Sequence, residues 1–576
     1  MFLKRQAAVC ILASAALVGG VATSSPAFAQ KKNEVVDLDE KPAAKGKKGV
    51  DIDLDENAPA EQGPVTAGAP TEGFATAKKL FEKEKWSDAA LGWYRVVSGD
   101  TGDDAGNKQL ADYYLAICLY RLKFYQASYA IFSVIADNKY HLKFGETLLW
   151  LAKLATQLPE PADIIERVGK YTDSEIARFD NAQQRDLYWQ LNYMLGRYKY
   201  RNRQYEDSIR LFQKVDRRSD NYVAAQFFTG VSFVQKRQSI PAVRSFQRIE
   251  KALEEGVKGI EDEQRMLDLS YLSMARTYYS ASIRLDAETN IPTIDGQKLS
   301  AAVKYWNKID VTSEYWLDAL FEESWAYFMA GDYPRALGNI HTIQSPYFPN
   351  SFYPEADILK AVIYFANCNY DAATIVVARF NKHYVPIRDE LKKLLKKYKE
   401  GNQEEAFFKF LKQLRDHSTS LNPQLEPIVA NALSDRQLLR NIEYVRLLEE
   451  ESSRFKKSPS SFQNSGIGQQ VRDALGLARD LAVKRAGELA LSRYQRFIDE
   501  IDEHVRNGEK ILIDITAAQR NLLDVKLKSG QVSKAESQVF GIVKPDEEHV
   551  LWPWDGEFWR DELGFYRQVV LSTCGR

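Results

Sequence analysis

The chain has 576 residues, and its 78 Lys and Arg residues nearly balance its 79 Asp and Glu residues, which leaves a formal net charge of -1. This balance argues against generic nucleic-acid binding, because that activity needs a basic surface. The length exceeds what one compact core supports, whereas a solenoid of repeats can extend this far.

The first 29 residues have the order of a secretory signal peptide. Lys4 and Arg5 precede an apolar segment at residues 7–21, and an A-x-A motif follows at residues 27–29. We therefore predict cleavage near Ala29 and a periplasmic mature protein. A retained membrane anchor is the alternative. Cys10 lies inside the apolar segment, so it does not match a lipoprotein cysteine.

Residues 30–72 are rich in Lys, Asp, Glu, Ala, Gly and Pro, and we predict a disordered leader. Within it the acidic motif Asp-Leu-Asp-Glu occurs twice, at residues 37–40 and 53–56. A solvated acidic spacer explains this composition. The alternative interpretation is a duplicated short linear motif.

Residues 73–383 carry the pattern of tetratricopeptide (TPR) repeats, in which small residues recur at fixed offsets from large ones. A shift of 34 residues carries one set onto another, namely Leu195, Gly196, Tyr205, Ser208, Phe212 and Val215 onto Thr229, Gly230, Ser239, Ala242, Phe246 and Ile249. The small residues let two helices approach, and the large residues fill the space beside them. Pro159 and Pro161 interrupt one repeat, and an insertion at about residues 285–297 interrupts another. The predicted fold class is all-α, a solenoid of TPR-type helical hairpins.

The TPR period fades after residue 383, but helical spacing of apolar residues continues. We expect a helical extension at 384–455, a Ser-, Gly- and Asn-rich linker at 456–469, and a helical C-terminal region at 470–576 with an aromatic-rich tail. Apolar residues between 494 and 522 follow three- and four-residue steps. A coiled-coil hairpin arm and a helix packed along the end of the solenoid both fit this pattern.

The tail and the cysteines each leave two interpretations open. Three Trp residues and three other aromatic residues crowd into residues 552–566, which suits either a final packed helix or an exposed docking patch. Removal of the signal peptide leaves Cys118, Cys368 and Cys574, which allow at most one internal disulfide. We expect Cys118 to be a buried free thiol and Cys574 to pair or to dimerise.

Candidate partner-binding residues are those that the first helix of each repeat would present to an inner groove, together with two tail tryptophans. Tyr, Trp and Arg dominate binding energy at interfaces. The residues are Tyr113, Tyr120, Arg121, Tyr193, Arg197, Tyr200, Arg201, Phe321, Trp325, Phe328, Trp552 and Trp559. The Arg and Tyr residues suit an acidic extended peptide. In the alternative interpretation these rings pack between adjacent repeats.

No catalytic motif, cofactor motif or metal-ligand spacing is found in the sequence. The six His residues are scattered, and the phosphate-binding and nucleophile-elbow glycine patterns are missing. We therefore predict a non-enzymatic protein without cofactor or metal.

Two further sequence features accompany the TPR pattern, namely Tyr-Pro-Glu-Ala at residues 353–356 and the aromatic segment at residues 551–559. Together with the repeats they suggest a known family. The chain resembles large periplasmic TPR proteins of myxobacteria, the family of the TPR component (GltE/AglT) of the adventurous-gliding (Glt) envelope complex. The resemblance implies a trans-envelope machine with inner- and outer-membrane protein partners, and membrane association only through them. Alternatives are an outer-membrane assembly adaptor similar to the Bam-complex TPR protein, and an envelope enzyme with a TPR front.

Overall fold

A computed structural model describes residues 65–257, 260, 262–285, 292–399, 403–416, 425–426, 428–429, 435–529, 538–540 and 546–574. The predicted signal peptide and both acidic motifs lie outside these residues. In the described part, helices dominate and two short antiparallel strand pairs complete the secondary structure. The all-α prediction is confirmed.

The chain forms two compact units. The amino-terminal unit comprises the described residues up to Leu187 together with Tyr444–Asp480, and the carboxy-terminal unit comprises Tyr188–Glu443 together with the described residues from Leu481 onward. Three helices contribute residues to both units: α21 (Arg436–Phe455), α23 (Gly466–Ser529) and, with its first three residues, α9 (Arg185–Arg201).

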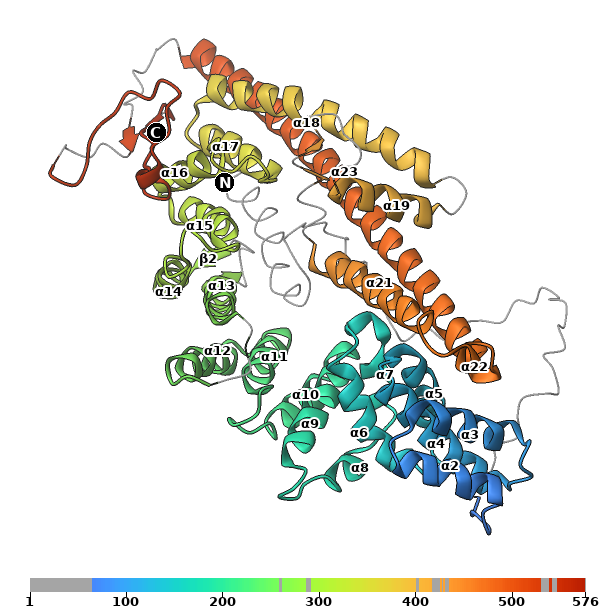
Figure 1. The fold of residues 1–576 in the computed structure, drawn as a ribbon. Helices are drawn as coiled ribbons and strands as arrows, with labels where there is room; N and C mark the ends of the chain where they lie inside the picture. Colours follow the sequence, from blue (N-terminus) through green and yellow to red (C-terminus); the bar gives the residue numbers. More distant parts are fainter. Residues whose placement is uncertain are drawn as a thin grey trace, which may run out of the picture. The chain divides into compact units, whose positions relative to one another are not determined.

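In the amino-terminal unit, successive helices pack as neighbouring hairpins (Figure 1). These elements are α2 (Glu72–Glu82), α3 (Trp86–Ser98), α4 (Ala105–Arg121), α5 (Tyr125–Asp137), α6 (Phe144–Ala155), η2 (Glu160–Ala162), α7 (Ile164–Val168), α8 (Asp173–Ala177) and α22 (Ser460–Gln463). The two prolines at 159 and 161 produce the short 3-10 turn η2 where a repeat helix would otherwise continue. The residues expected as a linker include α22, whose buried Phe462 stacks on Phe124 of the repeats with ring centroids 6.0 Å apart.

The carboxy-terminal unit continues the hairpins and ends in long helices. Its elements are α9 (Arg185–Arg201, whose first residues belong to the other unit), α10 (Tyr205–Phe212), α11 (Tyr222–Gln235), α12 (Ser239–Glu254), α13 (Glu263–Ser282), β1 (Ile283–Leu285), β2 (Pro292–Ile294), α14 (Gly296–Trp306), α15 (Trp316–Ala330), α16 (Tyr333–Ile343), α17 (Pro354–Ala366), α18 (Tyr370–Lys399), α19 (Glu404–Arg415), β3 (Gln538–Phe540) and β4 (Val570–Ser572). Strands β1 and β2 pair antiparallel at the start of and within the predicted insertion, with Arg284 opposite Thr293.

Close helix crossings explain the 34-residue period. A Cβ atom on Gly196 would lie 2.6 Å from the ring of Phe212, and a Cβ atom on Gly230 would lie 2.6 Å from the ring of Phe246. Both rings are fully buried. Each hairpin thus places a ring directly against a backbone that has no side chain, which fixes the distance between its two helices.

We expect Gly230→Ala to destabilise the carboxy-terminal unit by about 1–3 kcal/mol, because the added methyl group overlaps the buried Phe246 ring. Thermal or urea unfolding followed by circular dichroism measures this loss. Gly476→Ala is the control, because a Cβ atom on this helical glycine meets no neighbouring atom within 4 Å. That change should be neutral or stabilising by up to about 1 kcal/mol. Equal stability of the two variants would contradict the proposed crossing.

One residue with a left-handed backbone conformation closes each regular hairpin turn. It lies two positions before the first residue of the second helix in every case. These residues are Glu84, Lys123, Arg203, Arg237, Gly331 and Cys368, with φ between 57° and 78°. The turn geometry repeats faithfully, although only one of the six positions carries the glycine that this conformation favours.

Two long helices lie at the end of the solenoid. Helix α18 has 30 residues and runs without interruption through the boundary expected at residue 383, with Pro386 inside it. Helix α23 is one continuous helix of 64 residues, so the coiled-coil hairpin is wrong. Its residues Ile511 and Ile515 pack in one apolar cluster with Ile358 of α17 and Val377 of α18. The alternative, a helix packed along the solenoid end, is therefore observed.

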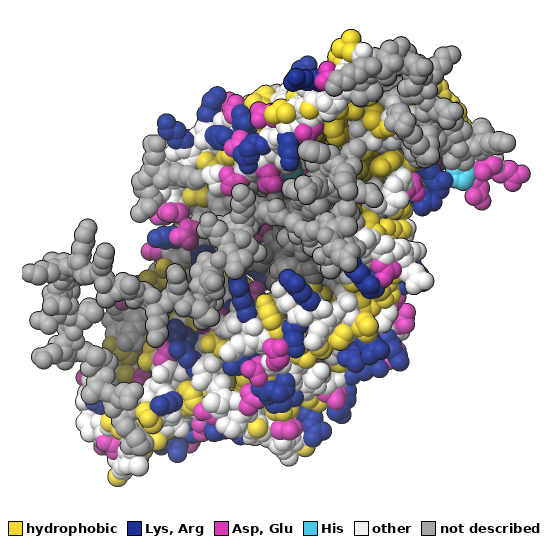
Figure 2. Space-filling model, turned by 180° about the vertical axis from the view of Figure 1, so that it is seen from behind, with side chains coloured by type: hydrophobic (Ala, Val, Ile, Leu, Met, Phe, Trp, Pro, Cys, Tyr) yellow, Lys and Arg dark blue, Asp and Glu magenta, His cyan; other side chains and the backbone are white. Residues whose placement is uncertain are grey.

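The surface carries both charge signs. Figure 2 shows Lys and Arg side chains interspersed with Asp and Glu side chains on one face, as the net charge of -1 implies. No helix in the described part of the chain is both long enough and apolar enough to span a membrane.

Candidate functional site

The C-terminal tail, residues 546–574, is fixed to α16, to the end of α17 and to the turn after α17. Backbone amides of the tail donate hydrogen bonds to the solenoid, from Gln568 to the Pro334 carbonyl and from Thr573 to the Asn367 carbonyl, each 3.0 Å long. The tail lies beside α16 in Figure 1. Its only described helical turn is the 3-10 turn η3 (Arg560–Glu562), so the predicted final helix is wrong.

Two observations show that the tail packs closely against the repeats. A Cβ atom on Gly338 of α16 would lie 1.7 Å from the Tyr566 carbonyl oxygen, so only glycine permits the tail backbone to pass there. The tail side chains Leu563 and Val570 are 6% and 1% exposed and belong to the apolar core of the repeats. The tail is therefore part of the folded unit.

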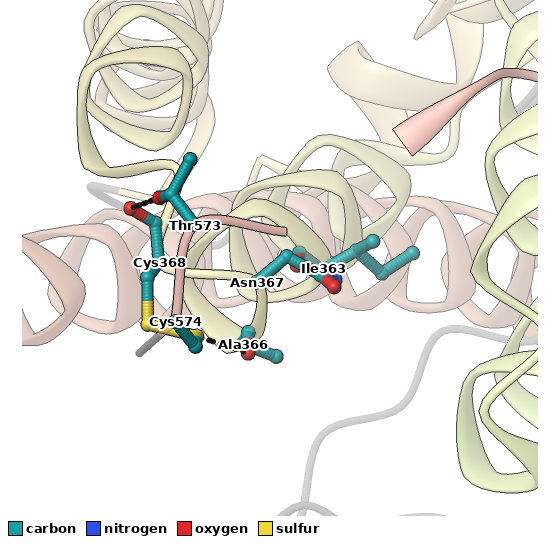
Figure 3. Close-up of a disulfide and its surroundings, with 6 residues drawn as sticks. All are labelled: Ile363, Ala366, Asn367, Cys368, Thr573 and Cys574. Carbon is teal, nitrogen blue, oxygen red and sulfur yellow. Dashed lines mark hydrogen bonds between the residues drawn. A yellow bond between two sulfur atoms is a disulfide. The ribbon is translucent and has the colours of Figure 1, made fainter. Parts of the chain in front are cut away.

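A disulfide between Cys368 and Cys574 fastens the end of the tail (Figure 3). Cys368 occupies the turn between α17 and α18, and the Thr573 hydroxyl donates a 3.0 Å hydrogen bond to its carbonyl oxygen. The predicted pairing of Cys574 is confirmed as an internal bond. Cys118 is a fully buried free thiol, also as predicted, and burial raises its pKa well above the usual range.

His341 of α16 anchors the aromatic part of the tail. Its ring stacks on Phe558 at 4.4 Å and meets the rings of Trp554 and Tyr566 edge-on at 5.1 and 5.0 Å. Burial lowers the pKa of His341 to about 4, so the ring is neutral at neutral pH and suits an aromatic cluster. The Tyr566 hydroxyl accepts a hydrogen bond from the Trp559 amide and donates one to the Trp559 carbonyl, which closes a loop.

Several apolar side chains of the tail are exposed to solvent. We call these six residues the tail platform: Val550, Leu551, Trp552, Trp554, Trp559 and Phe565, which are 75%, 62%, 54%, 58%, 39% and 77% exposed. The indole N–H groups of Trp552 and Trp554 donate to the Glu557 side chain and backbone, so the rings are held in place. Exposed apolar surface ringed by charge is typical of an interface.

A pocket of about 620 Å³ adjoins the tail platform. It lies between α14, α15, α16 and tail residues 563–567, and Trp306 and Trp316 contribute to its wall. Glu323 also lines it, accepting hydrogen bonds from Tyr327 at 3.0 Å and from Asn339 at 2.9 Å. Burial raises the pKa of Glu323. The pocket can take an apolar side chain beside a polar group.

Three predicted groove residues are buried, which contradicts their predicted exposure. Tyr113, Phe321 and Trp325 are only 6–9% exposed. Tyr113 accepts a 3.0 Å hydrogen bond from the Trp150 indole, and Phe321 packs against Tyr353 with ring centroids 5.5 Å apart. These rings fill space between helices, which is the alternative interpretation of the same spacing.

The other groove candidates form separate sets. In the amino-terminal unit, Tyr120 is partly buried against Trp150, and Arg121 is exposed with its guanidinium 5.6 Å from the ring centre of Trp86. In the carboxy-terminal unit, the partly buried residues Tyr193, Arg197 and Tyr200 all contact the ring of Phe228. Arg201 in the same helix is exposed, and Phe328 packs on Trp325 and Tyr333. Partner binding by either set stays a prediction.

The buried carboxyl group of Glu500 on α23 and the partly buried carboxyl group of Glu355 on α17 form a pair that was not predicted from the sequence. Burial raises the pKa of Glu355 to about 7 and the pKa of Glu500 to about 8. Negative charge adds to the shifts, since Glu503 acts on both groups and Glu355 acts on Glu500, while Arg493 opposes the shift of Glu500. These residues lie almost 150 positions apart, so no local motif could reveal the pair.

Comparisons with known proteins do not assign the chain to a family. No family model matches the chain. No curated protein matches it either. Among solved structures, the apo form of RapI aligns with 67% of this chain and 98% of its own, at 12% sequence identity and a TM-score of 0.31. The fold assignment therefore rests on the helical hairpins and their 34-residue spacing.

Proposed function

We propose that the protein is a non-enzymatic scaffold of the bacterial cell envelope that binds another envelope protein at the tail platform. One observation carries this proposal. Six exposed apolar side chains stand on a segment that backbone hydrogen bonds and a disulfide hold against TPR-type repeats. A binding surface fixed in advance loses little conformational entropy when a partner binds.

Two observations support the envelope as the compartment. Residues 1–29 have the order of a cleaved signal peptide, and the Cys368–Cys574 disulfide suits an oxidising compartment such as the periplasm. The resemblance to the gliding-complex TPR family leads us to propose a trans-envelope motility machine as the assembly. Inner- and outer-membrane components of that machine would be the partners.

The tail platform and the adjoining pocket suggest how a partner binds. The indole rings of Trp552 and Trp559 lie 5.0 Å apart and offer a broad apolar surface. A partner segment can cover these rings and place one apolar side chain in the pocket beside Phe565. Burial of large aromatic residues contributes roughly 2 kcal/mol or more each when they form the centre of an interface.

We expect the double change Trp552→Ala and Trp559→Ala to reduce recovery of the partner at least tenfold. Tagged protein purified from crosslinked envelope fractions, with quantitative mass spectrometry, measures this effect. Because both rings are exposed to solvent, each substitution should change the free energy of unfolding by no more than about 0.5 kcal/mol, as measured by thermal unfolding.

The matched control is Leu477→Ala with Leu481→Ala, which removes two exposed apolar side chains from α23 without touching the tail. This variant should recover the partner normally. Undiminished recovery by the tryptophan variant, or an equal loss in the control, would contradict the proposed docking surface.

A further inference from the structure

Two neighbouring cations of the amino-terminal unit each lie over a tryptophan ring. Arg121 and Lys153 stand in the last turns of α4 and α6, helices that belong to successive repeats. The Lys153 ammonium lies 4.5 Å from the ring centre of Trp150, and the Arg121 guanidinium lies over Trp86. Tyr120, the neighbour of Arg121 in sequence, meets the same Trp150 ring edge-on at 5.2 Å. We call this set the cationic face.

The charges of the cationic face are not neutralised by the part of the protein that the structure describes. Neither Arg121 nor Lys153 forms an ion pair with a described carboxylate. Burial, and then the nearby Arg121 charge, lower the pKa of Lys153. The carboxyl end of a helix favours one cation, but it does not explain two that repel each other across one surface. An anionic group placed between them would relieve the repulsion.

The chain carries a matching acidic segment close by in sequence. The second acidic motif comprises Asp53, Leu54, Asp55 and Glu56, with three carboxylates around one apolar side chain. No Lys or Arg stands between this motif and residue 65, where the described chain begins. The motif thus supplies carboxylates that can pair with the two cations and a leucine side chain that can pack on an aromatic ring.

The attachment point of the leader allows this motif to reach the cationic face. Gly68 lies at the amino end of α4, where its amide donates to Asp104 at 2.7 Å and its carbonyl accepts from Asn107 at 3.3 Å. Arg121 is the last residue of α4, a helix of 17 residues and thus about 25 Å long. The nine residues from 57 to 65 can span about 30 Å when extended.

We infer that residues 53–56 bind to the cationic face of the same chain, with carboxylates on Arg121 and Lys153 and Leu54 on the ring of Tyr120. The leader then carries a built-in acidic ligand for the first repeats. This contact is independent of the tail platform, which lies in the other unit. The short tether gives the second motif a high effective concentration, whereas the motif at residues 37–40 has a longer loop to close.

A labelled peptide that copies residues 51–58 tests the inference on the full-length mature protein. The wild-type site is occupied by its own leader, so it should bind the peptide weakly. The variant Asp53→Asn, Asp55→Asn, Glu56→Gln has an empty site and should bind the peptide at least tenfold more tightly, as measured by fluorescence anisotropy. Adding Arg121→Ala and Lys153→Ala to this variant should abolish the gain.

Lys139→Ala in the same variant is the matched control, because Lys139 also lies over an aromatic ring, 4.9 Å from the centre of Tyr140, but away from the cationic face. It should leave peptide binding unchanged. Carbodiimide coupling of carboxyl groups to amines should join residues 53–56 to Lys153 within one chain, as shown by mixing isotopically light and heavy protein. Equal peptide binding by wild type and the neutralised variant, or coupling only between different chains, would overturn the inference.

Discussion

Replacing Cys368 and Cys574 with serine is expected to lower the free energy of unfolding of the carboxy-terminal unit by about 2–5 kcal/mol and to release the tail. The disulfide joins residues 206 positions apart, so its loss greatly increases the conformational freedom of the unfolded chain. In the folded chain, the last tail residues would keep only a few hydrogen bonds, such as that of the Thr573 amide.

Urea unfolding and limited proteolysis measure the two parts of this result. The serine variant should be cut within residues 546–574 at protease concentrations that leave the wild type intact, and reduction of the wild type should have the same effect. Cys118→Ala is the control, because it removes the buried thiol without affecting the tail. A serine variant with wild-type stability and an uncut tail would show that the other contacts suffice.

The stability of the carboxy-terminal unit should fall as the pH rises from about 5 to 8. The folded pKa values of Glu355 and Glu500 are raised to about 7 and about 8 from the ordinary value of 4.5. Below the unfolded pKa both carboxyl groups are protonated in the folded and in the unfolded state, so burying them costs no free energy of ionisation. As the pH rises toward and through the folded pKa values, the unfolded state releases protons more readily and the fold loses stability. The loss should reach a few kcal/mol, since one pKa unit corresponds to about 1.4 kcal/mol.

Glu500→Gln tests the origin of this pH dependence, because it keeps the shape of the side chain and removes its charge. Free energies of unfolding measured by urea titration between pH 5 and 8.5 should decline less steeply in this variant. Glu509→Gln, an exposed change on the same helix, should behave like the wild type. A decline unchanged by Glu500→Gln would assign the pH dependence to other groups.

The repeats could be predicted because their spacing has a steric cause that is visible in the residues themselves. The pairs Gly196 with Phe212 and Gly230 with Phe246 mark the same crossing in two hairpins. The turns escaped prediction, since five of the six left-handed positions carry Glu, Lys, Arg or Cys. Tertiary packing imposes that conformation there, and residue type alone does not signal it.

The candidate site was predicted only in outline. The concentration of aromatic residues at 552–566 indicated an interface or a packed end; the tail packs against the repeats, and its role as an interface stays a prediction. Its extended path depends on Gly338, which lies more than 200 residues earlier on α16. Helical periodicity also misassigned Tyr113, Phe321 and Trp325, because it identifies one face of a helix but not the neighbour that covers that face.

Among the three cysteines outside the predicted signal peptide, Cys118 is synthesised first, Cys368 follows, and Cys574 comes 206 residues after Cys368. In an oxidising compartment, pairing in order of emergence would join Cys118 to Cys368 and leave Cys574 alone. Early folding of the local hairpin formed by α4 and α5 encloses Cys118, whose burial also suppresses the reactive thiolate. Burial of Cys118 in the first repeats thus favours the pairing of Cys368 with Cys574 over a pairing with Cys118.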